Sequence, residues 1–144
     1  MNIALKREDL LKSLQSIIGV VEKRQTMPIL ANVLLSCESN VLTLTATDLE
    51  VELISTFNID SSDSLTITLP GRKLLDICRS LPEGSIISIG VNEKKAVITS
   101  GKSKFSLTTL PANEFPLIPN INGEQQIKIN QSDLRYLIEN TQFS

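Results

Sequence analysis

The sequence contains no histidine and no tryptophan, and aromatic residues make up 3% of it. Without histidine, neither a Ser-His-Asp nor a Cys-His nucleophile can form, and there is no imidazole to bind a metal. The two cysteines, Cys37 and Cys78, lie far apart in apolar stretches, and we expect buried thiols in a reducing compartment. We therefore predict no catalytic site, no metal site and no cofactor. A carboxylate pair such as Asp48 and Glu50 is the remaining enzymatic alternative.

Glycine-rich phosphate loops and long apolar runs are also missing. The six glycines are scattered and match neither GxGxxG nor GxxxxGK[ST]. No apolar run approaches the roughly 18 residues that a membrane helix needs. Charged residues near the N-terminus interrupt it too early for a signal peptide. We expect a cytoplasmic protein with no membrane partner.

The 144 residues do contain a repeated apolar pattern, on a composition that is 41% hydrophobic. Segments 3–14, 67–78 and 127–138 each begin with two apolar residues at alternate positions, followed by two more at an interval of four. Alternation is typical of a half-buried strand, and spacing by four is typical of a helix. Repetition over a long period indicates a repeated supersecondary unit.

Between these openings the pattern predicts strands separated by polar turns. The strands are expected at 30–37, 41–47, 51–57, 85–91, 96–100 and 104–109. Each unit is therefore a βαβββ repeat, and the chain holds two of them. We predict an α+β fold with antiparallel sheets and with the two helices, near 8–20 and 72–81, side by side on one face.

The stretch from Pro111 to Gly123 contains three prolines and predicts a linker or domain boundary. We place a first domain at 1–122 and the start of a second domain at 123–144. The second part holds only a strand at 127–129 and a helix, the opening of a third repeat. That is too little to bury a core, so we expect the chain to be a fragment of a longer protein.

Charge is sorted along the chain, although the net charge is only −2. Residues 25–71 hold six acidic residues and no basic one. Residues 6–24 hold five basic and three acidic residues, and residues 72–83 hold three basic and two acidic ones. The helices are thus expected to be basic. Such a face would attract the phosphates of duplex DNA without reading base sequence, and a plain solvated helix surface is the alternative.

Five segments, in order, resemble the bacterial DNA polymerase III β sliding clamps. They are Arg24–Leu35, Leu42–Glu50, Lys73–Gly84, Phe105–Pro116 and Leu137–Ser144. The resemblance implies the DNA-clamp fold, with three similar domains in each subunit and a head-to-tail dimer that closes into a ring. It implies a processivity subunit that encircles double-stranded DNA, tethers the replicative polymerase and has no catalytic site of its own. Clamp-loader and polymerase subunits are implied partners, mainly through the second and third domains.

The resemblance also implies site residues. Arg24 matches a family arginine that approaches the duplex from a loop. The residues expected to face DNA are Arg24, Lys23, Gln25, Lys12, Arg72 and Arg79. Those expected where the first domain meets the second clamp subunit are Lys73, Lys102, Lys104 and Phe105. Lysines stand at 102 and 104 where some relatives have arginine, which weakens bidentate pairing with carboxylates.

Two alternatives to these assignments stay open. Phe105 could be an ordinary core residue. The whole chain could also be a β-rich protein-interaction module that uses an exposed edge strand and makes no DNA contact.

Overall fold

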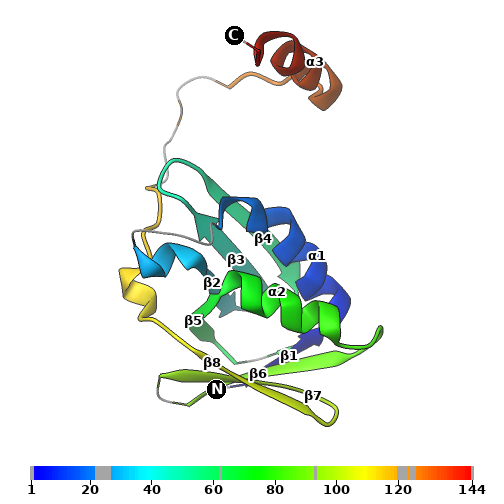
Figure 1. Cartoon of the computed structure of the whole chain (residues 1–144), viewed down its shortest axis with the longest axis vertical. Helices are drawn as coiled ribbons and strands as arrows, with labels where there is room; N and C mark the ends of the chain where they lie inside the picture. The colour runs from blue at the N-terminus through cyan, green and yellow to red at the C-terminus, as the bar shows by residue number, and fades with distance from the viewer. Residues whose placement is uncertain are drawn as a thin grey trace.

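The computed structural model describes residues 2–21, 27–61, 63–92, 94–119, 123 and 126–143. Figure 1 shows a body in which helices α1 and α2 pack against the strands, and one further helix at the C-terminal end of the chain. The elements are β1 (Asn2–Lys6), α1 (Arg7–Ile17), η1 (Ile18–Val20), η2 (Pro28–Ala31), β2 (Asn32–Glu38), β3 (Val41–Thr47), β4 (Glu52–Asn58), β5 (Leu65–Pro70), α2 (Gly71–Ser80), β6 (Ile86–Asn92), β7 (Lys95–Ser100), β8 (Ser103–Thr108), η3 (Ala112–Glu114) and α3 (Gln131–Thr141).

The strands form two antiparallel sheets, ordered β1-β6-β7-β8 and β4-β3-β2-β5. The predicted βαβββ order is confirmed along the chain. However, the first strand of each repeat joins the sheet of the other repeat. β1 pairs with β6, where Ile3 lies opposite Ile89, and β5 pairs with β2, where Ile67 lies opposite Leu35. This reciprocal exchange makes one body of the two repeats, because each sheet takes a strand from both.

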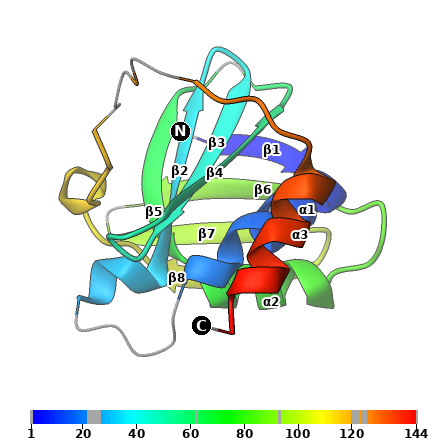
Figure 2. The same ribbon diagram turned by 90° about the horizontal axis from the view of Figure 1, so that it is seen from above.

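The two long helices of the body, α1 and α2, pack against one another and against the sheets. Their position side by side on one face was predicted, and Figures 1 and 2 show it in two views. The apolar residues of each helix point into a single core shared with both sheets. Fully buried members on the helices include Leu10, Leu14, Leu74 and Cys78, the positions of the repeated pattern.

A two-residue turn joins β2 to β3 at the predicted position. Ser39 and Asn40 have φ angles of 50° and 65°, so both occupy the left-handed region. Two-residue hairpin turns favour this conformation because its twist matches that of the flanking strands, and asparagine tolerates it well.

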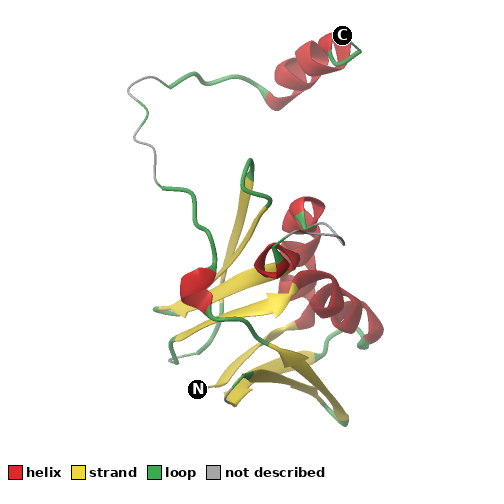
Figure 3. Ribbon diagram, turned by 60° about the vertical axis from the view of Figure 1, so that its left-hand side comes forward, coloured by secondary structure: helices red, strands yellow, loops and turns green. Residues whose placement is uncertain are grey.

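The third repeat forms its helix but not its strand. α3 covers Gln131–Thr141 as predicted, whereas the strand expected at 127–129 is wrong, because residues 126–130 are neither helix nor strand. The side chain of Ile127 is 91% exposed. In the first two repeats this strand is held by the strand that follows the helix of the other repeat. The described residues after α3 contain no strand, so the exchange has no third member, and α3 stands apart from the body (Figure 3).

Candidate nucleic-acid interface

Helix α1 is electrically neutral by itself. Its basic residues Arg7 and Lys12 are balanced by Glu8 and Asp9. The expectation of a basic helix is therefore wrong for α1, and the surplus counted over residues 6–24 comes from positions outside the helix. Lys12 is exposed, as a DNA-facing role requires.

Arg7 is turned inward and joins the two helices. Its side chain is 12% exposed, and its Nε donates a 2.8 Å hydrogen bond to the carbonyl oxygen of Cys78, near the end of α2. Next to it, Glu8 accepts a 2.8 Å bond from the backbone N–H of Gly84, which lowers the pKa of the Glu8 carboxyl. The start of α1 is thus fastened to the end of α2 and to the turn that follows it.

Helix α2 carries the positive charge of this face. Arg72, Lys73 and Arg79 outnumber Asp76, and all four are exposed. Their exposure follows from the apolar spacing, which turns Leu74, Leu75, Ile77 and Cys78 toward the core. An exposed cation on a helix attracts a phosphate group, and this modest electrostatic free energy is reduced by salt because the charges are screened.

Arg72 already has a structural partner. Its Nε and Nη2 donate hydrogen bonds of 3.0 and 2.6 Å to the carbonyl oxygen of Val21. A guanidinium group has five N–H donors, so donors remain for a phosphate. Arg72 therefore links α2 to the residues that follow α1. It is also a candidate for DNA contact.

The predicted residues Lys23, Arg24 and Gln25 lie outside the described residues. Of their flanks, Val21 is 1% exposed and held by Arg72, and η2 begins at Pro28. The proposal for these three residues thus continues to rest on the resemblance.

The residues predicted for the subunit interface lie on α2 and on the last strand of one sheet. Lys73 is in the first turn of α2, Lys102 is in the turn between β7 and β8, and Lys104 and Phe105 are on β8. All three lysines are exposed, whereas Phe105 is half-buried and packs against the main core. β8 has a neighbour on one side only among the described strands. The sequence patterns did not reveal that β8 is a sheet edge.

The carboxylate pair considered as an enzymatic alternative belongs to a turn. The Oδ1 atom of Asp48 accepts hydrogen bonds from the backbone N–H groups of Glu50 and Val51, at 3.0 and 2.8 Å. These bonds lower the pKa of the Asp48 carboxyl. A general acid needs a raised pKa. Asp48 therefore acts as the acceptor that shapes the turn between β3 and β4.

Comparison with known proteins decides the family. Residues 1–119 match the model of the DNA polymerase III beta subunit, N-terminal domain. The chain belongs to the DNA polymerase III beta subunit family. It is 49% identical to a beta sliding clamp of Vibrio harveyi over the whole of both chains, and 48% identical to that of Pseudomonas putida, of which it spans 40%.

Solved structures of sliding clamps show the same fold. A sliding clamp of Pseudomonas aeruginosa bound to griselimycin is 49% identical with a TM-score of 0.92, and the match covers all of this chain and 39% of that one. The polymerase III beta of Caulobacter crescentus is 37% identical with a TM-score of 0.94, again over all of this chain and 39% of that one. The predicted DNA-clamp fold is thereby confirmed.

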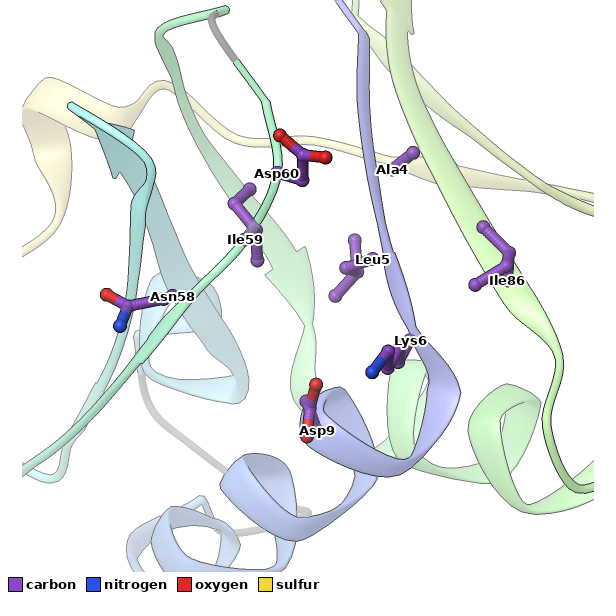
Figure 4. Close-up of a pocket in the computed structure, with 8 residues that line it drawn as sticks. All are labelled: Ala4, Leu5, Lys6, Asp9, Asn58, Ile59, Asp60 and Ile86. Atoms are coloured by element: carbon purple, nitrogen blue, oxygen red, sulfur yellow. The ribbon is translucent and has the colours of Figure 1, made fainter.

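A hollow of about 550 Å³ lies between β1 and the residues that follow β4 in this clamp domain (Figure 4). Leu5, Ile59 and Ile86 supply apolar lining, and Lys6, Asp9 and Asp60 place charges of both signs around it. Among the described residues, none of those predicted for DNA or for the subunit interface lines this hollow.

The two cysteines of the clamp domain are free and buried. Burial raises the pKa of the Cys78 thiol to about 12, and burial together with Asp63 and Glu38 raises the pKa of the Cys37 thiol. Within the described ranges, no cluster of three or more potential metal-binding side chains occurs. No described helix has the length and apolar character required to span a bilayer.

Proposed function

We propose that this chain is the first domain of a sliding clamp subunit, residues 1–122, with the start of the second domain at 123–144. The complete subunit encircles double-stranded DNA as a head-to-tail dimer and tethers the replicative polymerase, without a catalytic site of its own. The observation that carries the proposal is the pair of helices α1 and α2, side by side on one face, with the surplus of basic residues on α2. Such a face suits a ring whose hole is lined by helices.

In this function the protein stays on DNA because it encircles the duplex, and tight binding is not required. A closed ring cannot leave DNA sideways, so processivity comes from topology while individual phosphate contacts remain weak. Exposed cations such as Lys12 and Arg79 suit this task, since their attraction to phosphates is screened by salt and independent of base sequence. Arg24, with Lys23 and Gln25, would contact the duplex at one face of the ring.

The proposal extends to the partners and to the place of action. The second clamp subunit would contact this domain at β8, through Lys104 and Phe105, and at Lys102 in the turn before β8. Lys73 of α2 would belong to the same interface. Clamp-loader and polymerase subunits would bind mainly through the second and third domains, of which residues 123–144 form the beginning. The assembly would work in the cytoplasm, where bacterial replication takes place.

A salt titration on short linear duplex DNA tests the DNA-facing surface, because a ring can slide off a linear duplex and topology cannot mask affinity. In the full-length protein, Arg24→Ala and Arg79→Ala should each weaken binding equally on all sequences. Each should reduce the salt slope by about one unit for one lost phosphate contact. Lys95→Ala, an exposed lysine of β7, is the matched control and should change neither value. Two variants indistinguishable from Lys95→Ala would contradict the proposed DNA-facing surface.

A further inference from the structure

The segment that follows β8 is hydrogen-bonded to β5 near its start. Thr68 of β5 is fully buried. Its hydroxyl donates a 2.8 Å hydrogen bond to the carbonyl oxygen of Leu110 and accepts bonds from the Leu110 N–H and from Nδ2 of Asn32, at 3.1 and 3.0 Å. A hydroxyl has one donor and two acceptor positions. All three are in use, and two of them hold Leu110.

Phe115 fastens the same segment a second time. It is 5% exposed and packs with Ile29, Leu30 and Leu34 in a cluster separate from the main core. Leu34 belongs to this cluster because strand residues alternate between faces, and its neighbours Val33 and Leu35 face the main core. Phe115 therefore covers the face of the sheet opposite the helices.

A third fastening lies on β4. The backbone N–H of Ile118 donates a 2.9 Å hydrogen bond to Oε2 of Glu52. The order of the sheet is β4-β3-β2-β5, so the three contacts lie in turn on β5, β2 and β4. Residues 110–118, here called the strap, thus contact both edge strands of the sheet, and Figure 1 shows them running past one end of its strands.

We propose that Phe115 and Glu52 are positioning residues that hold the strap, and thereby determine where the chain leaves this domain. The composition of Pro111–Gly123 predicted a linker, and a free linker would leave the following residues without a defined starting point. Three contacts across the whole width of the sheet instead bring the chain to the edge strand β4. Whatever follows the strap then begins beside β4. The inference does not depend on DNA binding.

Two independent measurements on the full-length protein test the strap. The first is cleavage by a glutamate-specific protease after Glu114, which is exposed and adjoins Phe115. Phe115→Ala should raise the cleavage rate by at least about tenfold, since the docked segment must open before it can enter a protease. Leu117→Ala is the matched control, because Leu117 lies in the same strap with 59% of its surface exposed. Equal rates for the two variants would overturn the role of Phe115.

The second measurement is amide hydrogen exchange, and it remains decisive if Phe115→Ala unfolds the domain. Glu52→Ala removes the acceptor for the Ile118 N–H and should accelerate exchange of that amide by about tenfold or more. Glu52→Gln keeps a side-chain oxygen at this place and should retain most of the protection. The role of Glu52 would be overturned by equal exchange in these two variants. Leu110 and Ile118 amides that exchange at unprotected rates in the unaltered protein would overturn the strap itself.

Discussion

The guanidinium group of Arg72 grips the carbonyl oxygen of Val21 with two hydrogen bonds, from Nε at 3.0 Å and from Nη2 at 2.6 Å. Residue 71, the first residue of α2, is a glycine that lies close to β2. A Cβ atom on Gly71 would lie 2.7 Å from Cγ2 of Val33. The start of α2 is thereby held against the residues that follow α1, and an arginine predicted to face DNA has a second, structural task.

Arg72→Ala should therefore lower the free energy of unfolding by about 1–2 kcal/mol, because a charged donor to a carbonyl is lost and the group is partly solvated. Arg72→Lys should recover part of this, since an ammonium group cannot reproduce the paired donors. Arg79→Ala is the control on the same helix and should cost less than about 0.5 kcal/mol. Urea unfolding of the three variants measures the difference. Similar midpoints for the two alanine variants would show that the Val21 contact adds nothing.

Leu49 occupies the left-handed region, with φ of 79°, in the turn that Asp48 shapes. Its side chain is 53% exposed, so little apolar burial is at stake. Leu49→Gly should raise the free energy of unfolding by about 0.5–1 kcal/mol, because glycine adopts this conformation without strain. Leu49→Ala keeps a Cβ and should give no gain. Thermal unfolding compares the two, and a loss of stability in the glycine variant would show that the side chain matters more than the strain.

The cysteine thiols should be inert in the folded protein. At pH 8 a thiol reagent should react with neither Cys37 nor Cys78, and with both after denaturation, because both are buried with a raised pKa. Reaction of either thiol in the folded state at the denatured rate would contradict the burial.

The raised pKa of Cys78 also predicts a pH dependence. The stabilisation from its protonated thiol is fully present below the ordinary pKa of 9.0 and is lost as the pH rises toward about 12. Unfolding free energies measured from pH 8 to pH 11 should therefore fall more steeply in the unaltered protein than in Cys78→Ala. Parallel curves would mean that this thiol does not contribute.

The exposed charge of β8 leads to a prediction about assembly. In the full-length protein, Lys104→Glu should weaken the dimer by about tenfold or more, because a reversed charge at an interface rim opposes a complementary partner. Lys12→Glu reverses a charge on the helical face and should leave dimerisation unchanged. Sedimentation equilibrium measures both dissociation constants. A dimer that tolerates Lys104→Glu as well as Lys12→Glu would remove β8 from the proposed interface.

Local periodicity was enough to predict most elements. The alternation of Val41–Thr47 coincides with β3, and spacing by four placed Leu10 and Leu14 on the buried side of α1. These features depend on which face of a helix or strand packs against the core. The spacing of apolar residues within a few positions of one another determines that face. The family resemblance rested on strings of the same local kind, which is why it survived comparison with solved clamps.

Only the tertiary structure decided which strands pair and where the cations point. Segment 127–129 has the same alternation as 3–5, yet no strand forms there, because a strand requires a partner edge and alternation does not supply one. The pairing of β1 with β6 and of β5 with β2 likewise depends on strand edges that are distant from one another in the sequence. The charges of Arg7 and Arg72 could be read from the sequence. That their guanidinium groups turn to the carbonyl oxygens of Cys78 and Val21 follows from the packing of α1 against α2, which no local pattern contains.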